Sequence, residues 1–390
     1  MSFFYLFVCL ALFAIGDFLG VFTKAKLSSV FVALILFLVG FMTKVLPGDI
    51  IEQAGLTQIS KWSAAFIVFH MGTKINFKQL VKEWRTVVVS LIAMIVALIS
   101  LLAVSPIIGK ESAIVSIPII NGGLIATQIM TEGAMEKGLT LAAALGTIVY
   151  AVQKFVGTPP ASFHGLKEAE KMLVAYRTNN GAGVSLNKIN IETAKEEKVL
   201  LYKKYDKYFT DFVCLAVTGF FAWISSWLGK ATPVNYSIWA LILGAVVGGA
   251  GLIPPSILEK GKASGLLQMA IFASIIPSLA KISMADLAVL GWQTVVVFIA
   301  CMVGIYIFMY LLPTWKICGS KDLAVGIAMA QLLGFPATYL IANEIATAVA
   351  KTPDEKEYVL SKLMPAYVVA GFVSVTSLSI IIAGIMVKFL

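Results

Sequence analysis

Long apolar runs alternate with short polar segments along most of the chain. Runs such as Phe3–Phe22, Thr86–Ile108 and Val295–Leu312 contain about 20 residues each, which is enough for a helix to cross a hydrocarbon core of about 30 Å. This pattern predicts ten full-length membrane helices, near residues 3–22, 28–46, 58–73, 86–108, 139–158, 209–229, 236–253, 265–281, 293–312 and 359–387. We therefore expect an all-α polytopic membrane protein.

Two further apolar segments, 112–137 and 322–350, contain residues that interrupt a helix. The first reads NGGLIATQ at 121–128, and the second contains Gly-Phe-Pro at 334–336. Backbone groups freed at such breaks cost several kcal/mol each when they face lipid, so they are tolerated where they line a cavity or bind a ligand. The alternative is that the glycines only permit close helix packing. Because both segments are interrupted, we favour two re-entrant hairpins.

The chain also repeats itself. The sequence FVCLA occurs at 7–11 and again at 212–216, and WRTVVV at 84–89 is matched by WQTVVV at 292–297. These and other matches follow the same order in both halves, which makes chance similarity of apolar helices a poor explanation. The repeat predicts three parts, namely a first repeat over 1–165, a polar connector over 166–206 and a second repeat over 207–390.

Composition and charge indicate how the two repeats are oriented. Of 390 residues, 59% are hydrophobic and 13% are charged, against about 25% charged in an average soluble domain. The net charge of +9 comes from lysines and arginines in predicted loops, which is typical of the positive-inside rule and does not indicate nucleic-acid binding. If each hairpin leaves the membrane on the side it entered, each repeat has five crossings and the second repeat is inverted. Most basic residues, including those of the connector, are then cytoplasmic, and both termini lie outside the inner membrane.

The length of the first hairpin arm agrees with this arrangement. Ser112–Asn121 contains ten residues, or about 15 Å of helix, which is about half the hydrocarbon depth. The break therefore lies near the midplane of the bilayer. Inverted repeats whose broken helices meet at the midplane are typical of secondary transporters. We expect two inverted repeats of five transmembrane helices, each with a re-entrant hairpin.

Residues around the breaks have the chemistry to bind a cation and an anion. Freed carbonyls and threonine hydroxyls are oxygen donors suited to Na⁺, which we expect at Gly123, Thr127, Gly334 and Thr338. The N-terminal amides of each second arm can hold a carboxylate. The predicted binding residues are Asn121, Gly122, Gly123, Thr127, Gln128, Glu132, Gln331, Gly334, Phe335, Pro336, Thr338, Asn343 and Glu344.

Three charged side chains within apolar segments have two interpretations each. Glu132 and Glu344 lie one to two turns from the hairpin tips, where a carboxylate is either functional or an interfacial charge. Lys154 can meet a substrate anion, although extension of its amine to the cytoplasmic surface is the favoured interpretation. The lone histidines His70 and His164 have no metal partner at a usable spacing, so we expect structural roles for them.

Three stretches carry a resemblance to a known family. SIPIINGGLIATQ at 116–128, GTPPASF at 157–163 and GFPATYLIAN at 334–343 are similar to the first re-entrant loop, the end of the fifth helix and the second loop of the sodium/glutamate symporters. That family belongs to the inverted-repeat class that also contains the 2-hydroxycarboxylate transporters. The resemblance implies a 5+5 fold, sodium-coupled uptake of an anionic amino acid or carboxylate, and a homodimer. The first loop departs from the family's Gly-Gly-His-Gly-Thr pattern, since Leu124 follows Gly123 and the loop becomes apolar.

These features predict a secondary active transporter, namely a sodium-coupled symporter of a small organic anion such as glutamate or a carboxylate, acting by alternating access. A monovalent cation/proton antiporter is the alternative, but it would need a buried carboxylate pair, for which only Glu132 and Glu344 are available. The sequence contains no Cys-x-x-Cys, no Ser-His-Asp set and no phosphate-binding loop, so we do not expect an enzyme. Sodium is the expected coupling ion, no other cofactor is expected, and the lipid bilayer is the expected surrounding.

Overall fold

The chain is an all-α membrane protein. The computed structural model describes residues 2–23, 29–178, 201–334 and 337–390, and within these ranges the regular structure is helical, with no strand. Six helices in this described part are long and apolar enough to cross a membrane. They cover Phe3–Gly20, Trp84–Ala103, Thr140–Thr178, Asp211–Ala231, Met284–Leu311 and Pro353–Phe389.

Helices of the first half lie at or near the five predicted ranges. The long ones are α1 (Ser2–Phe22), α2 (Ser29–Met42), α4 (Leu56–Thr73), α6 (Trp84–Ala103) and α10 (Thr140–Thr178). Short helices join them, namely α3 (Ile50–Gln53), α5 (Phe77–Lys82) and α7 (Ser105–Ile108). The interrupted segment forms two helices, α8 (Lys110–Ile120) and α9 (Leu124–Glu136).

The second half follows a similar order. It begins with α11 (Leu201–Lys204) and the 3₁₀ turn η1 (Asp206–Tyr208). The longer helices are α12 (Asp211–Ala231), α13 (Tyr236–Gly249), α15 (Ser264–Ile275) and α16 (Met284–Tyr306). The short elements are α14 (Ile257–Lys260) before α15, η2 (Ile276–Ser278) after it, and η3 (Ile307–Leu311) and η4 (Pro313–Ile317) after α16. The second interrupted segment forms α17 (Lys321–Leu333) and α18 (Ala337–Val349). The last predicted helix is α19 (Pro353–Phe372), the π-helical turn η5 (Val373–Leu378), α20 (Ser379–Met386) and η6 (Val387–Phe389).

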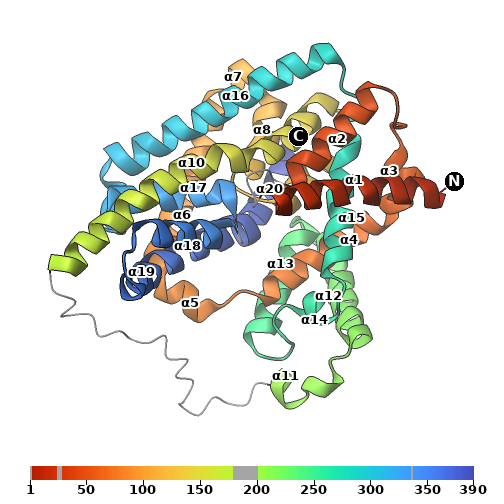
Figure 1. Cartoon of the computed structure of the whole chain (residues 1–390). Helices are drawn as coiled ribbons and strands as arrows, with labels where there is room; N and C mark the ends of the chain where they lie inside the picture. Colours follow the sequence, from red (N-terminus) through yellow and green to blue (C-terminus); the bar gives the residue numbers. More distant parts are fainter. Residues whose placement is uncertain (1, 24–28, 179–200, 335–336) are drawn as a thin grey trace.

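The helices form two packed groups (Figure 1). In the panel group, α4 packs against α3, α12, α13, α14 and α15, and α1 packs against α2 and α3. In the core group, α10 packs against α8, α9, α16, α17, α18 and α19, while α20 contacts α8 and α9. Fewer contacts join the groups, and they include α15 with α9, α13 with α20, and α2 with α10. The halves of the chain therefore contribute helices to both groups.

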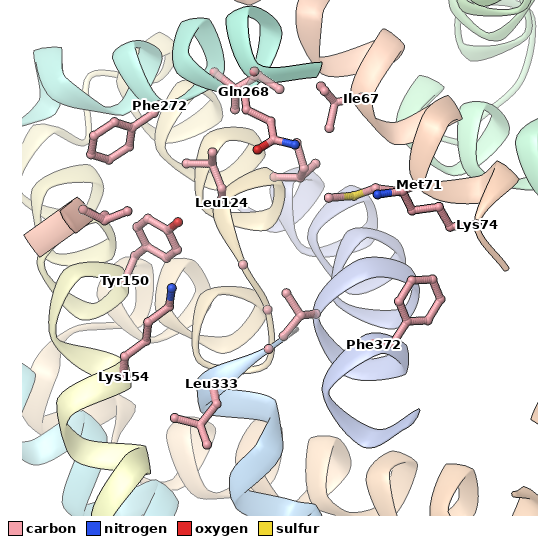
Figure 2. A pocket seen from close by; sticks show the side chains of 18 of the residues that line it. Ile67, Met71, Lys74, Leu124, Tyr150, Lys154, Gln268, Phe272, Leu333 and Phe372 are labelled. Atoms are coloured by element: carbon pink, nitrogen blue, oxygen red, sulfur yellow. The ribbon is translucent and has the colours of Figure 1, made fainter. Parts of the chain in front are cut away.

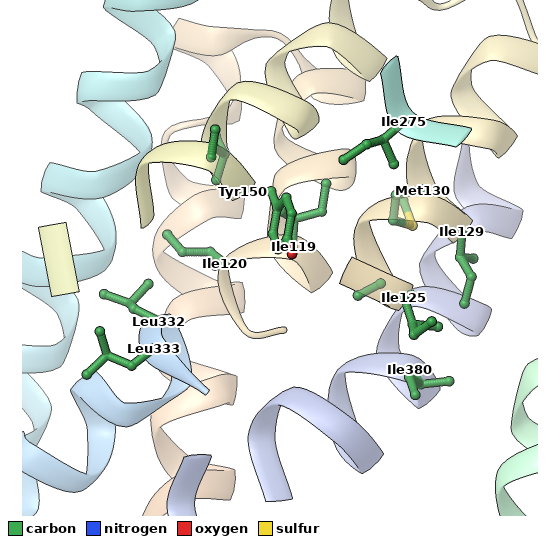
Figure 3. Packing of buried hydrophobic residues seen from close by; sticks show 14 of the residues in the cluster. Ile119, Ile120, Ile125, Ile129, Met130, Tyr150, Ile275, Leu332, Leu333 and Ile380 are labelled. Atoms are coloured by element: carbon green, nitrogen blue, oxygen red, sulfur yellow. The ribbon is translucent and has the colours of Figure 1, made fainter. Parts of the chain in front are cut away.

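Apolar side chains surround the tip of the first hairpin (Figure 3). Ile119 and Ile120 end α8, and Ile125 lies in the first turn of α9. Both helices are buried against neighbours from the second half, including Leu332 of α17 and Ile380 of α20. All five side chains are at most 5% exposed. Burial of this apolar surface holds the hairpin in place and offsets the cost of breaking the helix.

Helix α10 is longer than the resemblance implies. GTPPASF at 157–163 does not end the helix, because α10 continues through Pro159 and Pro160 to Thr178. Each proline removes one backbone donor from the helix interior. A tertiary contact supports this part of the helix, since the buried hydroxyl of Tyr367 donates a hydrogen bond to the carbonyl of Ala161 at 2.9 Å. Residues 166–178 of the predicted connector are thus helical, and residues 179–200 lie outside the described residues.

Ion pairs fasten the end of α10 to the second half. Lys171 Nζ lies 2.5 Å from Asp322 Oδ2 in α17, and the other oxygen of Asp322 lies 2.6 Å from His164 Nδ1. Arg177 donates two hydrogen bonds to the carboxylate of Glu355 in α19, at 2.7 and 2.9 Å. Both carboxylates are almost buried, so they need these partners. His164, for which the sequence showed no metal partner, is part of this cluster.

Candidate functional site

The first helix break lies between α8 and α9. Asn121 caps α8, Gly122 follows, and Gly123 has extended backbone angles of φ −116° and ψ −155°. A Cβ at Gly122 would clash with the Cβ of Ser379 in α20, so this position requires glycine. The backbone N–H and the hydroxyl of Thr127 both donate to the carbonyl of Gly123, each at 3.1 Å. The start of α9 is therefore fixed by its own first turn.

The second break lies between α17 and α18. Gly334 follows α17 with φ +68° and ψ 170°, a left-handed conformation that favours glycine. Its carbonyl accepts a hydrogen bond from the backbone N–H of Thr338 at 3.1 Å. Phe335 and Pro336, which the sequence also predicted to take part in binding, lie outside the described residues.

Val375 of η5 lies between the two breaks. A Cβ added at Gly123 would be 2.6 Å from Cγ1 of Val375, and one added at Gly334 would be 2.9 Å from Cγ2. Two positions 211 residues apart in the sequence are thus brought against one side chain. The structure brings the two break points together at this place.

Gln153 of α10 supports the first break, although the sequence interpretation did not single it out. Its side-chain Nε2 donates to the carbonyl of Gly122 at 3.1 Å, and the side chain is 2% exposed. This hydrogen bond satisfies a backbone group that the break removes from helical pairing. A sequence signal was present, because Gln153 and Lys154 form a polar pair in an apolar helix.

Five buried side-chain oxygens near the breaks have no hydrogen-bond donor among the described residues. They are Asn121 Oδ1, Gln128 Oε1, Gln153 Oε1, Gln331 Oε1 and Thr338 Oγ1. Buried polar atoms are normally paired, so a set of unpaired oxygens favours a positively charged ligand. Among the four residues predicted to hold Na⁺, the Thr338 hydroxyl is one of these oxygens, whereas the Thr127 hydroxyl is engaged with Gly123. The unpaired oxygens near the breaks are hard donors.

A cavity of about 950 Å³ lies between the panel group and the core group. The panel side is lined by residues of α1, α2, α4 and α15, and the core side by residues of α9, α10, α19 and η5 (Figure 2). Three of the predicted binding residues line it, namely Gly122, Gly123 and Gly334. The cavity therefore reaches both helix breaks.

Lys154 and Tyr150 extend from α10 into this cavity (Figure 2). The two residues are four positions apart, so they share one face of the helix. No carboxylate of the described residues lies within ion-pair distance of the Lys154 amine. Lys154, for which the sequence favoured an amine at the cytoplasmic surface, lies on the cavity wall.

The cavity wall also contains one ion pair. Lys74 Nζ, just past the end of α4, lies 2.5 Å from Glu259 Oε1 in α14. The hydrogen bond from Lys74 lowers the pKa of the Glu259 carboxyl. His70 lies beside them, and its Nδ1 accepts from the backbone N–H of Leu258 at 3.2 Å, which agrees with a structural role.

The other predicted polar residues lie away from the cavity surface. Gln128 donates to Glu132 at 3.0 Å and to the backbone carbonyl of Ser60 in α4 at 3.4 Å, so it joins the core group to the panel group. Glu344 is exposed on α18, and Asn343 donates to the carbonyl of Tyr339 one turn earlier. Neither carboxylate lines the cavity.

No protein-family model matches the chain, and no curated protein is significantly similar to it. Within the described residues, no group of three or more histidine, cysteine, aspartate or glutamate side chains is arranged to hold a metal ion.

Proposed function

We propose that this protein is a secondary active transporter, a sodium-coupled symporter of a small organic anion that acts by alternating access. The observation that carries this proposal is the cavity between two helix groups, which reaches both helix breaks and is lined by Lys154, whose amine has no carboxylate partner among the described residues. A cavity between two packed groups can open to either side of a membrane when one group moves against the other. The amine and the N-terminus of α9 supply positive potential for an anion.

The proposed architecture is a pair of inverted repeats, 1–165 and 207–390, joined by the connector. The order of elements supports it, since each half has two long helices, a short helix, two more long helices, a broken pair and a final long helix, although the first half also contains the short helices α5 and α7. With five crossings per repeat, both termini are outside and the connector is cytoplasmic, in the inner membrane. The resemblance to the sodium/glutamate symporters and the expected homodimer belong to the same proposal.

Sodium is the proposed coupling ion, bound near Gly123, Thr127, Gly334 and Thr338. The unpaired oxygens of Thr338 and Asn121 support this choice, because they lack donors and are hard ligands. Sodium binding there would then favour the arrangement in which both breaks lie against Val375.

The rival function is monovalent cation/proton antiport, with Glu132 and Glu344 as the proton-carrying groups. The exposed position of Glu344 and the distance of both carboxylates from the cavity wall weigh against it. Purified protein in liposomes separates the two functions. An inward sodium gradient should drive accumulation of a labelled organic anion without making the lumen alkaline. Alkalinisation of the lumen driven by inward Na⁺ or K⁺, with no anion uptake, would replace symport by antiport.

A further inference from the structure

We propose that the substrate is a monocarboxylate with an apolar body, bound with its carboxylate at Lys154 and Tyr150. This inference rests on the proposed function, because it takes the cavity as the substrate site. It narrows the substrate class from small organic anions in general to those with one carboxylate and no ammonium group.

The carboxylate end of the site is built from α10 and α9. Lys154 supplies an amine and Tyr150 a hydroxyl from the same face of α10, and both line the cavity (Figure 2). Leu124 and Ile125 line it too, and they belong to the first turn of α9, where backbone N–H groups have no partner within the helix. A carboxylate at this place receives charge-assisted hydrogen bonds and lies at the positive end of a helix. It also supplies the opposite charge that stabilises a largely buried ammonium.

The charged side chains of the cavity wall indicate how many carboxylates the substrate carries. Only two cationic side chains line the cavity within the described residues, Lys154 and Lys74. Lys74 is already paired with Glu259 at 2.5 Å. A dicarboxylate would therefore bring its second negative charge to a wall without a second free cationic side chain, which costs several kcal/mol per desolvated ion.

An amino acid would need a partner for its ammonium group. The core wall, from α9, α10, α17, α19 and η5, contributes no aspartate or glutamate to the lining. Two acidic residues line the panel side, Asp17 of α1 and Glu259, and Glu259 is engaged by Lys74. The ammonium of an α-amino acid is one carbon from its carboxylate, so a carboxylate bound at Lys154 would place that ammonium near the core wall and not near Asp17. A substrate without an ammonium group fits this distribution better.

Apolar side chains form much of the rest of the wall, beside the polar residues Ser29, Asn76, Gln79, Ser256 and Gln268. Phe272 of α15, Ile67 and Met71 of α4, and Leu124 and Phe372 of the core group surround the space beside Lys154 (Figure 2). Side chains of this kind gain about 25 cal/mol for each Å² of apolar surface that a ligand covers. Contacts between the apolar body of the ligand and this wall would therefore increase the binding affinity.

A binding experiment on the purified full-length protein in detergent tests this inference. Binding is preferred to uptake, because protonated apolar acids cross bilayers unaided. Four ligands contain six carbons each: 4-methylpentanoate, leucine and 4-methylpentanamide share one branched frame, and hexanedioate is the straight-chain dicarboxylate. Titration calorimetry with sodium present should give 4-methylpentanoate a dissociation constant at least about tenfold lower than the other three, as expected for one charge-assisted interaction.

Variants of Lys154 and Tyr150 test whether these two side chains bind the carboxylate of the ligand. Lys154→Met should weaken 4-methylpentanoate binding by about tenfold or more, Lys154→Arg should restore most of it, and Tyr150→Phe should weaken it a few-fold. Lys167→Met is the matched control, since Lys167 is exposed on the same helix and does not line the cavity. Lys154→Met removes a buried charge, so its melting temperature should not fall.

Three results would overturn the inference, namely tighter binding of leucine or hexanedioate, absence of binding by all four ligands, or equal binding by Lys154→Met. Failure of the proposed function would look different. If 4-methylpentanoate binds in a Lys154-dependent way while liposomes show no sodium-driven uptake of any bound anion, the ligand class stands and symport does not.

Discussion

The side-chain amide of Gln153 donates a hydrogen bond to the backbone carbonyl of Gly122 at 3.1 Å. Gln153 lies in a continuous helix, and Gly122 lies where another helix is broken. The contact therefore gives a backbone group inside a membrane protein the partner it lost when the helix ended. Its neighbour Lys154 lines the cavity, so the same turn of α10 holds the break and faces the proposed substrate.

Gln153→Leu should destabilise the protein by about 1–3 kcal/mol, because it leaves the Gly122 carbonyl buried without a donor. The melting temperature in detergent should fall, and anion binding should weaken because the start of α9 is displaced. Gln58→Leu is the control, since Gln58 is exposed on α4. Equal melting temperatures for the two variants would show that the hydrogen bond does not support the break.

The two break glycines should respond differently to alanine. Gly123→Ala places a Cβ 2.6 Å from Val375, but its φ of −116° suits any residue. The double variant Gly123→Ala/Val375→Ala should therefore recover stability and transport. Gly334→Ala should stay impaired in the Val375→Ala background, because its φ of +68° costs about 1 kcal/mol or more for a residue with a Cβ.

Gly291→Ala is the reference for these glycine variants. A Cβ at Gly291, within α16, meets nothing within 4 Å, so alanine should be neutral or stabilising by about 0.5–1 kcal/mol. Melting temperatures of all the variants should be measured together with sodium-driven uptake. Rescue of Gly334→Ala by Val375→Ala would mean that crowding, and not backbone conformation, fixes the second glycine.

Two residues of the ion-pair cluster at the end of α10, Asp322 and Lys171, should contribute unequally to the stability of the protein. Asp322→Ala removes the partner of both Lys171 and buried His164, so we expect a loss of about 1–3 kcal/mol. Lys171→Ala should cost less than about 1 kcal/mol, because the lysine side chain is 58% exposed. The midpoint of thermal unfolding checks this order. Similar shifts for both variants would indicate that only the Lys171–Asp322 pair matters.

Cysteines introduced at Lys110 and Lys351 should react with a membrane-impermeant thiol reagent from opposite sides of the membrane. Both lysines are exposed at the outer ends of the broken segments. The background needs the single change Cys318→Ser, since Cys9, Cys214 and Cys301 are buried. Labelling of both positions from the same side would contradict the inverted repeats.

Much of the fold was accessible from the sequence. A membrane helix is a local pattern, so runs such as Phe3–Phe22 and Thr86–Ile108 gave α1 and α6 within a few residues. The breaks were accessible for the same reason, because Gly122, Gly123 and Gly334 interrupt the pattern where they stand. Helix type and helix interruption depend on neighbours in the chain.

Features that depend on distant contacts were not accessible. The sequence gives no reason for α10 to pass through Pro159, because the supporting Tyr367 lies 206 residues after Ala161. Val375 is one of many valines until the fold sets it between the two breaks. The place of Lys154 on the cavity wall likewise depends on how the panel group covers α10. The roles of these side chains can be predicted only when the packing of the whole chain is known.

Helix α10 touches all four arms of the two hairpins, and its Phe155 packs edge-on against Phe31 of α2 at 4.8 Å between ring centres. Neither break can then shift alone, since one rod connects them. A covalent crosslink installed between positions 31 and 155 would immobilise both tips with a single bond, and would hold the proposed carrier in one facing state for study.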